Sequence, residues 1–426
     1  MTERLQAPRG TFDVLPEDWD ARTALEHRAR DLLESAGYRR IETPAFEATE
    51  LFARGVGEAT DIVQKEMYSF DDGGGRSLTL RPEGTAPISR AYMEHGMHKL
   101  PAPVKLWYLG PFFRHERAQA GRYRQFWQVG AEALGSDDPA LDAELIVLLH
   151  TLLDELGVRD LRLLLSSLGQ PGAREAYRDQ LKEYLHAHAD RLSSDVRARI
   201  DLNPLRAFDA DHPGTREVMK DAPRLIDHLD AADAEHFAHV RALLDKADIA
   251  YEIDPTLVRG LDYYTRTVFE FTSEALGAQS GVGGGGRYDG LVQMLGGPPT
   301  AGVGWAAGIE RMLLAGAEAP HGAAPVELFV ALDDGGRRED AFATVVAARR
   351  AGLHAEMELA GRSLKGQLKQ ADRLGARYVA ILRAQEAELR DMSSAEQEPV
   401  VTDEGEDAVS PEAIVSAALR GLRGVA

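Results

Sequence analysis

Two charged residues at strand spacing give the clearest chemical signal in the sequence, and they lie within residues 113–128, FRHERAQAGRYRQFWQ. Arg114 and Glu116 are two positions apart, so on a β-strand their side chains project from the same face. The arginine can neutralise a phosphate there, and the carboxylate can accept a hydrogen bond from an exocyclic amine. We therefore predict two antiparallel strands joined by a loop at residues 118–122 that bind a nucleotide. The alternative is a surface hairpin held by cross-strand salt bridges.

Two further groups of polar residues adjoin predicted elements. Residues 81–85, RPEGT, end a strand and begin a helix, where Glu83 and Thr85 can hold an ammonium group. The alternative is a helix cap with an ordinary acidic residue in the first turn. Tyr263 and Tyr264 are adjacent on a predicted strand and point to opposite faces. One of them is therefore expected in the core, and the other can line a pocket.

Two glycine-rich segments follow later in the chain. Residues 283–289, GGGGRYD, allow close approach of the backbone to a ligand. They lack the Lys-Ser/Thr pair of a Walker loop and the spacing of a dinucleotide loop, so in isolation they predict a flexible turn. The small side chains of residues 302–311, GVGWAAGIER, allow a strand to pack tightly on a helix. Arg311 lies in the first turns of that helix. The alternative to a functional role is that this arginine is simply solvated.

The elements that position these groups are predicted from hydrophobic periodicity. Short strands rich in aromatic and β-branched residues fill residues 77–134, with too few residues between them for helical crossovers, so antiparallel pairing is favoured. Residues 172–250 are helical and charge-rich, as in an inserted helical module. After a linker at residues 316–325, strands and helices alternate as βαβαβ, which predicts a small parallel or mixed sheet. Residues 386–406 are acidic and weakly patterned, and a last helix is expected at residues 411–420.

Length and composition limit the class of protein. A chain of 426 residues predicts two or three domains. The net charge of −20 argues at first sight against a nucleic-acid partner, but an enzyme that holds RNA needs only a local basic surface. The absence of cysteine excludes disulfides, thiolate metal sites and cysteine nucleophiles, and it fits a reducing cytoplasm. Since there is neither a signal peptide nor an apolar run of membrane-spanning length, we expect a cytoplasmic protein without a membrane partner.

In order and spacing these segments resemble the motifs of class II aminoacyl-tRNA synthetases, and their details resemble the histidyl-tRNA synthetases. Residues 113–128 are similar to motif 2, residues 302–311 to motif 3, and residues 43–57 to motif 1, which builds the dimer interface in this family. Residues 257–264 and 283–291 resemble the two histidine-specific signatures. The resemblance covers nearly the whole chain.

The resemblance implies a fold and an assembly. It implies an α+β catalytic domain with a mixed, mainly antiparallel sheet over residues 1–322, with a helical insertion at residues 172–250. A C-terminal α/β anticodon-binding domain is expected over residues 325–426. The family's usual strand pair after the last parallel strand looks shortened around residues 386–399. A homodimer formed through the motif 1 region is also implied.

The resemblance assigns five residues to ATP and to catalysis. It implies that Arg114 binds the α-phosphate, Glu116 the adenine amino group and Arg311 the γ-phosphate, while Arg122 helps to bind the triphosphate. Arg259, which is typical of the histidine enzymes, is expected on the opposite side of the α-phosphate. There Arg114 and Arg259 stabilise the negative charge that develops as a carboxylate attacks phosphorus. Mg²⁺ is expected to bridge the phosphates, and no metal site made by protein side chains is expected.

The amino acid implied is L-histidine, which is joined to AMP with release of pyrophosphate and then transferred to the 3′ end of histidine tRNA. A carboxylate and a tyrosine hydroxyl can satisfy both imidazole nitrogens. The residues expected around the α-amino group are Glu83, Thr85 and Gln128, those facing the imidazole are Glu132 with Tyr263 or Tyr264, and Tyr288 and Arg259 complete the pocket.

Contacts with tRNA are implied for two surfaces. Arg117 and Gln119 are expected to contact an extra guanine at the 5′ end of the tRNA. Arg362, Lys365 and Lys369 are expected to contact phosphates near the anticodon.

Two other classes of protein compete with this interpretation. Regulatory subunits of ATP phosphoribosyltransferase share the catalytic fold but typically lack the C-terminal domain and catalytic motif residues, and synthetases for other amino acids lack the RGLDYY sequence at residues 259–264.

Overall fold

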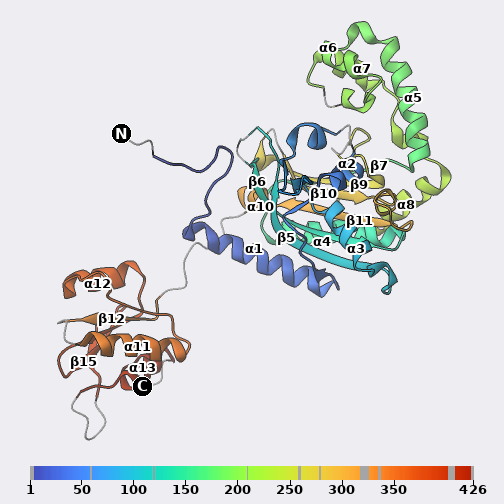
Figure 1. Ribbon diagram of the computed structural model, residues 1–426. Helices are drawn as coiled ribbons and strands as arrows, with labels where there is room; N and C mark the ends of the chain where they lie inside the picture. Colours follow the sequence, from blue (N-terminus) through green and yellow to red (C-terminus); the bar gives the residue numbers. More distant parts are fainter. Residues whose placement is uncertain are drawn as a thin grey trace. The chain divides into compact units, whose positions relative to one another are not determined.

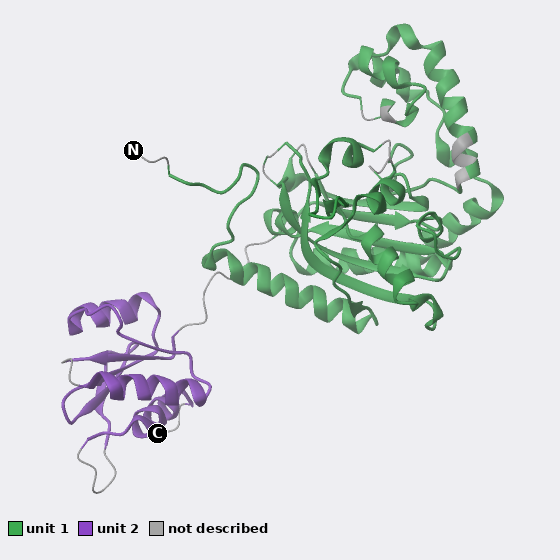
Figure 2. Ribbon diagram, in the orientation of Figure 1, with its two compact units in different colours: residues 1–320 green, residues 321–426 purple. Residues whose placement is uncertain are grey.

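The computed structural model describes residues 4–57, 60–117, 119, 121–208, 210–257, 261–277, 280–316, 326–333, 337–401 and 408–423, apart from the side chains at 171, 173–175 and 206. The chain forms two compact units, residues 1–320 and residues 321–426 (Figure 2). The first unit contains a large sheet with its covering helices, a small sheet and a helical module. No helix among the described residues of either unit is long and apolar enough to cross a membrane.

An eight-stranded sheet forms the centre of the first unit (Figure 1). Neighbouring strands pair antiparallel except at the two edges, where β1 with β5 and β7 with β8 are parallel. This arrangement confirms the mixed, mainly antiparallel sheet expected from the sequence. In order across the sheet, the strands are β1 (Arg39–Arg40), β5 (Val104–Phe113), β6 (Gln125–Leu134), β11 (Gly302–Gly308), β10 (Gly281–Arg287), β9 (Thr265–Ser273), β7 (Leu161–Ser167) and β8 (Glu252–Ile253).

Alternation along the strands separates an apolar face of this sheet from a polar face. Val129 and Ala131 of β6 belong to the core under the covering helices, whereas Gln128 and Glu132 alternate with them and project from the other face. The covering helix α4 is capped by Asp138, whose side chain accepts a hydrogen bond from the second residue of the helix. The helices of this core are α1 (Pro16–Ser35), α4 (Pro139–Glu155), α8 (Ala231–Lys246) and α10 (Ile309–Ala315).

Short elements pack on the polar face near β5 and β6. Ile88 and Tyr92 of helix α3 share a buried apolar cluster with Leu106 and Tyr108 of β5. A small antiparallel sheet adjoins them, in the order β2, β4, β3. The elements of this region are β2 (Phe46–Ala48), α2 (Thr49–Val56), the π-helix η1 (Ile62–Glu66), β3 (Ser69–Asp71), β4 (Ser77–Leu80), α3 (Thr85–Glu94), the 3₁₀ helix η2 (Met97–Lys99) and α9 (Leu291–Met294). The 3₁₀ helix η6 (Glu274–Leu276) follows β9 and packs on α10 instead.

A helical module, residues 171–228, is inserted between β7 and α8. Its buried apolar side chains form one cluster with Tyr263 and Tyr264, which precede β9, and with Tyr288, which follows β10. The next helix, α8, packs on α4 and β9 of the large sheet instead. The module consists of α5 (Pro171–Ala187), η3 (Ala189–Arg191), α6 (Ser194–Arg199), η4 (Pro204–Ala207), α7 (Pro213–Lys220) and η5 (Leu225–His228).

The second unit has a five-stranded sheet between helices. Its first three strands pair in parallel, and the last two add antiparallel pairs. Helices α11 and α13 bury one face, and α12 packs on the other. In sheet order the strands are β13 (Ala355–Met357), β12 (Leu328–Leu332), β14 (Tyr378–Leu382), β15 (Ala387–Asp391) and β16 (Gln397–Pro399), and the helices are α11 (Arg338–Arg350), α12 (Leu364–Arg373) and α13 (Pro411–Arg423).

Three local expectations were wrong. The glycine segment at residues 283–286 forms part of β10 in the middle of the sheet, where a side chain at Gly285 would overlap the backbone of β11. The strand expected to reach residue 117 ends at Phe113. Tyr263 and Tyr264 do not lie on a strand: they precede β9, which begins at Thr265, and both are buried. The segment around residues 386–399, where a shortened strand pair was expected, contains the short strands β15 and β16.

Candidate active site

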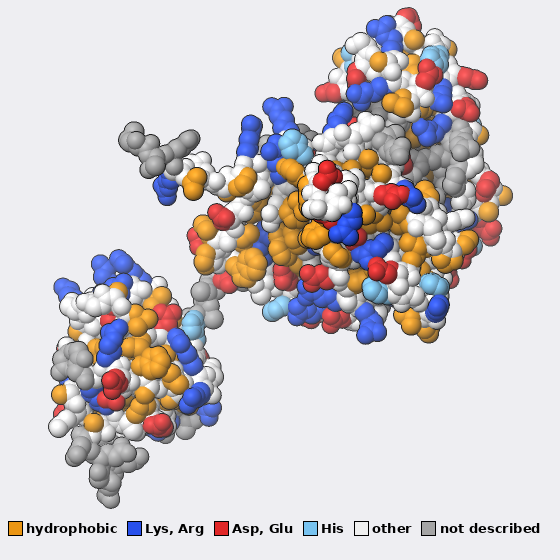
Figure 3. Space-filling model, viewed as in Figure 1, with side chains coloured by type: hydrophobic (Ala, Val, Ile, Leu, Met, Phe, Trp, Pro, Cys, Tyr) orange, Lys and Arg blue, Asp and Glu red, His pale blue; other side chains and the backbone are white. Residues whose placement is uncertain are grey.

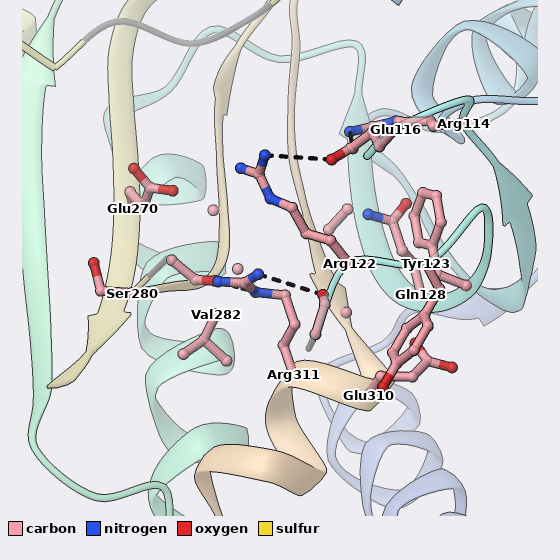
Figure 4. Close-up of a pocket in the computed structure, with 17 residues that line it drawn as sticks. Arg114, Glu116, Arg122, Tyr123, Gln128, Glu270, Ser280, Val282, Glu310 and Arg311 are labelled. Carbon is pink, nitrogen blue, oxygen red and sulfur yellow. Dashed lines mark hydrogen bonds and ion pairs between the residues drawn. The ribbon is translucent and has the colours of Figure 1, made fainter. Parts of the chain in front are cut away.

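A pocket of about 370 Å³ opens on the polar face of the large sheet (Figure 4). Glycines of β10 and β11 line it and leave it room, because they carry no side chain. The hairpin between β5 and β6 contributes most of the opposite wall, and α10 contributes the rest. The charged groups in this site, which we call the arginine pocket, are Arg114, Glu116, Arg122, Glu270, Glu310 and Arg311.

Arg114 is held in place where β5 passes into the hairpin. Its backbone N–H donates to Arg124 O at 3.0 Å, which continues the pairing of the two sides beyond the strands. Its Nε donates to Pro82 O at 2.8 Å, and its guanidinium lies 5.4 Å from the centre of the Phe126 ring. The guanidinium is therefore oriented by a carbonyl and an aromatic ring, which leaves its other nitrogens for a ligand.

Glu116 lies between two arginines. Its Oε1 is 3.8 Å from Arg114 Nη1, and its Oε2 is 3.3 Å from Arg122 Nη1. Arg122 exchanges backbone hydrogen bonds with Gln119 in a tight turn, in which Gly121 adopts a φ of +72°. The Arg122 side chain is 45% exposed, so it can change position with little loss of packing.

Arg311 connects α10 to the sheet and to the hairpin. Its Nε donates to Gly281 O, and its Nη1 donates to Gly121 O at 3.4 Å. Burial, together with the neighbouring positive charge of Arg122, lowers the pKa of Arg311. An anion placed between these two guanidinium groups would offset their repulsion, so the pocket suits a polyphosphate.

Residues near the N-terminus support this wall. Arg22 of α1 is buried and donates to Glu310 Oε1 at 2.7 Å, and Glu310 Oε2 accepts from Trp127 N at 3.1 Å. The Phe12 ring packs on Tyr123, with ring centres 4.5 Å apart. These contacts fix the start of β6 against α10, and the sequence analysis did not identify any of them.

A second group of polar side chains lies buried on the same face of β6. Glu132 is only 1% exposed, and it lies four positions beyond Gln128, which lines the arginine pocket. Thr85 Oγ1 donates to Glu132 Oε1 at 2.8 Å, and the Tyr288 hydroxyl donates to Oε2 at 2.6 Å. Both carboxylate oxygens are therefore fixed by hydroxyl donors.

Glu83 is fixed by the N-terminus of α3. Its carboxylate accepts from Thr85 N at 2.8 Å and from Ala86 N at 2.9 Å, where the helix end favours a negative charge. The Tyr263 hydroxyl donates to Glu83 Oε2 at 3.2 Å, and the Tyr263 ring centre lies 4.8 Å from that of Tyr264. We call this group the acid–tyrosine cluster, and its members are Glu83, Thr85, Glu132, Tyr263 and Tyr288.

The two carboxyl groups of the cluster have unusual affinities for protons. Burial raises the pKa of Glu132 to about 8, although the hydrogen bonds from Tyr288 and Thr85 oppose this shift. Burial also raises the pKa of Glu83, against the effect of the helix N–H groups. A ligand that brings an ammonium group or N–H donors would stabilise both carboxylates, so the cluster suits a cationic, nitrogen-rich ligand.

Glycines opposite the large side chains leave room for this cluster. A Cβ at Gly304 would overlap Glu132 Oε2, and a Cβ at Gly130 would overlap the Tyr108 ring. Tyr108 is buried beside the cluster, and its hydroxyl has no hydrogen-bond partner among the described residues. The sequence analysis missed Tyr108, although its position opposite Gly130 in the β5–β6 pair could have indicated it.

The remaining expected residues of the first unit lie apart from the cluster or outside the described part of the chain. Gln128 lines the arginine pocket, and its Oε1 has no partner among the residues that the structure describes. Arg117 and Gln119 are exposed on the hairpin. Arg259 lies outside the described residues. Glu270, which lines the pocket, was missed, although it is a lone acidic residue between two phenylalanines of β9.

The expected anticodon contacts lie in the second unit. Arg362 lies just before α12, Lys365 at its start and Lys369 in its middle, and all three are exposed. Figure 3 shows Lys and Arg side chains gathered over this helix. Arg362 Nη1 lies 3.4 Å from Glu358 Oε2, so this arginine is partly engaged within the protein. Within the described ranges, no group of three or more His, Asp or Glu side chains is placed to hold a metal ion.

The fold and the site define a class of protein. The mainly antiparallel sheet carries an arginine-bearing hairpin, and beside it the strand β11 leads into the arginine-bearing helix α10. This is the architecture of the class II aminoacyl-tRNA synthetases. The sequence profile of the histidyl-tRNA synthetase family matches residues 10–312. The chain belongs to the histidyl-tRNA synthetase family.

Individual relatives support this assignment over nearly the full length. The histidine–tRNA ligase of Halorhodospira halophila is 51% identical over 384 residues, which cover 89% of this chain and 90% of that protein. The histidine–tRNA ligase of Desulfitobacterium hafniense is 48% identical over 405 residues, which cover 92% and 95% of the two chains. The crystal structure of apo S. aureus histidyl-tRNA synthetase is similar with a TM-score of 0.79 at 34% identity, and covers 97% of this chain and 99% of that chain.

Proposed function

We propose that this chain activates L-histidine with ATP to histidyl-adenylate, with release of pyrophosphate, and then transfers histidine to the 3′ end of histidine tRNA. One observation carries the proposal: the arginine pocket and the acid–tyrosine cluster meet on one face of β6. Arg114 lies at their junction, because its Nε binds the carbonyl of Pro82, the residue before Glu83. A polyphosphate site, which suits ATP, thus adjoins a site for a cationic, nitrogen-rich ligand, which suits histidine.

In this proposal, the arginine pocket binds ATP. Arg114 contacts the α-phosphate, Arg311 the γ-phosphate and Arg122 the triphosphate chain, and Glu116 accepts from the adenine amino group. The position of Glu116 between Arg114 and Arg122 supports these roles, because ATP phosphates can replace its carboxylate as the partner of both arginines.

The acid–tyrosine cluster then binds histidine. Glu83, Thr85 and Gln128 surround the α-amino group, while Glu132 accepts from one imidazole nitrogen. A hydroxyl from Tyr263 or Tyr264 donates to the other nitrogen. The pKa of about 8 at Glu132 supports this role, because a buried carboxyl without a cation gains most from an N–H donor. A pocket with such polar groups rejects apolar amino acids of similar size, which would leave them unpaired. Tyr288 orients Glu132 and lines the same pocket.

Adenylate formation needs no covalent bond to the enzyme. The histidine carboxylate attacks the α-phosphorus, a carboxyl–phosphoryl bond forms, and the bond to the β-phosphate breaks to release pyrophosphate. Arg114 on one side and Arg259 on the other stabilise the charge on the α-phosphate oxygens. The role of Arg259 rests on its place in the histidine-specific signature of the sequence.

Mg²⁺ is proposed to accompany ATP. The pocket carboxylate of Glu270 and the phosphate oxygens are the hard oxygen ligands that this ion prefers, so the pocket fits it. When bound, Mg²⁺ would neutralise part of the phosphate charge.

Two surfaces are proposed for the tRNA. Arg117 and Gln119 project from the hairpin next to the reaction centre, where they can contact the extra guanine at the 5′ end. In the second unit, proposed as the anticodon-binding domain, Arg362 and Lys365 offer phosphate contacts at the start of α12. We also propose a cytoplasmic location, supported by the absence of cysteine from the 426 residues.

A homodimer through the motif 1 region is proposed as well. Phe46 of β2 and Phe70 of β3 are 50% and 45% exposed, and their ring centres lie 6.3 Å apart. Exposed aromatic side chains that lie together favour burial by a partner. Light scattering should give the mass of two chains for the wild type and a lower mass for Phe46→Asp.

Amino-acid-dependent ATP–pyrophosphate exchange tests the proposed activity. We expect exchange with histidine and at least about 1,000-fold weaker exchange with phenylalanine or glutamine, because unpaired polar groups disfavour them. Charging of a histidine tRNA transcript should follow. Histidine binding without exchange would instead indicate a histidine-binding regulatory subunit, and exchange with another amino acid would contradict the specificity.

A further inference from the structure

Helix α8 carries two buried polar side chains outside the two sites described above. Asp233 has 0% exposure and His236 has 7%. They are three positions apart, so they lie on the same side of the helix. Buried polar groups of this kind are stable only when they bond to specific partners, so their partners indicate what α8 does.

Asp233 joins the helical module to β9. Its Oδ2 accepts from Gln170 N at 2.7 Å, and its Oδ1 accepts from Arg266 Nε at 2.8 Å. Gln170 is the N-cap residue of α5, the first helix of the module, and its side chain makes no cap. In a capping box, an acidic or amide side chain at the third helical position binds the N–H of the N-cap residue. The sequence has Ala173 at that position, so Asp233 makes this bond from another helix.

Arg266 lies at a β-bulge. Its φ is +44°, and the register of β9 against β10 shifts between Gly286 and Arg287. Its backbone N–H donates to Gly169 O at 2.9 Å, next to the start of the module. A bulge redirects a side chain, and an arginine with positive φ persists only where other contacts stabilise it. Here the bond to Asp233 is such a contact.

The residues beside Arg266 connect it to the tyrosines at the acid–tyrosine cluster. Thr265 directly follows Tyr264, and its Oγ1 accepts from Asp289 N at 3.3 Å. Asp289 directly follows Tyr288, whose hydroxyl is a member of the cluster. A displacement of Arg266 would therefore reach Tyr264 through Thr265, and it would reach Tyr288 through Thr265 and its bonded neighbour Asp289.

His236 connects α8 to the residue that precedes Tyr288. Its Nε2 lies 3.3 Å from Asp142 Oδ1, and Arg287 Nε donates to Asp142 Oδ2 at 3.1 Å. Arg287 directly precedes Tyr288. Burial alone would raise the pKa of Asp142, but the bonds from His236 and Arg287 bring it below its ordinary value. Asp142 is therefore ionised and holds Arg287 firmly.

The apolar packing connects the same parts. Tyr177 and Leu181 of α5 belong to one buried cluster with Tyr263, Tyr264 and Tyr288. Close-packed side chains transmit displacements, so a shift of α5 would disturb the tyrosines as well.

We propose that α8 is the positioning helix of the histidine pocket. Through Asp233 it holds the helical module and the segment after Tyr264 in one arrangement, and through His236 and Asp142 it holds the segment before Tyr288. The arrangement of the module thereby sets the affinity for histidine, and this inference rests on the proposed function. Asp233 touches no substrate and is a positioning residue.

The test uses two variants and a control in the full-length protein. Asp233→Asn keeps an oxygen for Gln170 N but removes the charge that pairs with Arg266. Arg266→Gly removes the guanidinium and suits the positive φ, so its fold should be retained. Glu252→Gln is the control, because it breaks an ion pair with Arg162 at the edge of the same sheet, where both side chains are about half exposed.

Exchange kinetics with histidine and ATP varied in turn give the answer. We expect the KM for histidine to rise about tenfold in Asp233→Asn and Arg266→Gly, the KM for ATP to stay within about twofold, and the control to change neither. Unchanged histidine KM, or an equal rise for both substrates, would overturn the role of α8. Calorimetric titration with histidine alone makes the same comparison without catalysis. A wild type that binds histidine but lacks exchange therefore contradicts the proposed function, whereas equal binding by all four proteins contradicts this inference.

Discussion

The arginine pocket and the acid–tyrosine cluster share one face of β6, but they are built in opposite ways. In the pocket, Arg122 is 45% exposed and lies 3.3 Å from Glu116, and Arg114 lies 3.8 Å from the same carboxylate. In the cluster, Glu132 is 1% exposed and accepts hydrogen bonds of 2.6 and 2.8 Å. The first can rearrange around a charged chain, whereas the second is already formed without its ligand.

This difference separates the chemical step from the choice of amino acid. The half-exposed Arg122 guanidinium can follow the phosphates, while Arg114, held by Pro82 O, is a fixed donor where charge develops during the reaction. A rigid, buried shell cannot adapt to a wrong side chain, so it provides selectivity. Substitutions in the two regions should therefore change different kinetic constants.

The largest effect is expected in the arginine pocket. Arg114→Ala should reduce kcat for histidine-dependent exchange by about 100- to 1,000-fold, because it removes a fixed donor to the α-phosphate. Histidine binding measured by calorimetry should change little. Arg76→Ala, in the exposed loop between β3 and β4, is the matched control and should retain full exchange. A kcat of Arg114→Ala within threefold of the wild type would contradict this role.

A smaller effect is expected in the acid–tyrosine cluster. Glu132→Gln keeps the shape of the side chain but loses its charge, so kcat/KM for histidine should fall by about 10- to 100-fold. The KM for ATP in the same variant is the internal control and should be unchanged. An equal loss for both substrates would mean that the two regions are not separate.

A steric change tests how tightly the cluster is packed. Gly304→Ala places a methyl group on Glu132 Oε2, so the carboxylate must move and the KM for histidine should rise about tenfold. Gly290→Ala is the control, because its Cβ meets no atom within 4 Å and its φ of −92° suits alanine. If both variants behave alike, the packing around Glu132 is loose.

The smallest effect concerns stability and pH. The pKa of Glu132 rises from 4.5 to about 8 on folding, so the unfolded chain binds fewer protons between these values and the free energy of unfolding falls as pH rises. The Glu132→Gln variant does not lose unfolding free energy in this way, because glutamine does not titrate. Without histidine, its melting temperature relative to the wild type should therefore increase from pH 5 to pH 9 by roughly 3 °C or more. A difference independent of pH would show that Glu132 is ionised throughout.

The same contrast explains how much the sequence could predict. Arg114 and Glu116 of the arginine pocket were predicted because arginine and acid at strand spacing have a clear chemical use, the ATP-binding roles of Arg122 and Arg311 followed from the family resemblance, and Glu270 was missed. Glu83 and Thr85 were predicted from their place at the start of a helix, Glu132 and Tyr288 followed from the family resemblance, and the structure brings these residues together. Tyr108 was missed, because a tyrosine among apolar strand residues has the pattern of an ordinary core residue.

Other features depend on contacts between distant segments. Four consecutive glycines have little strand propensity, and β10 forms because β9 and β11 pair with it on both sides. The strands β15 and β16 are short and acidic. They form because β15 pairs with β14 and β16 pairs with β15. Asp233 looks like part of a solvated helix face in the sequence, and only its bonds to Gln170 and Arg266 distinguish it.

Calorimetric titration of histidine without ATP tests the separation of the two regions most directly. The wild type, Arg114→Ala and Glu132→Gln are compared in the same buffer near pH 7. We predict that Arg114→Ala binds histidine within about threefold of the wild type, whereas Glu132→Gln binds at least about tenfold more weakly. Equal weakening in both variants, or tight binding by Glu132→Gln, would contradict the assignment of ATP to the arginine pocket and of histidine to the acid–tyrosine cluster.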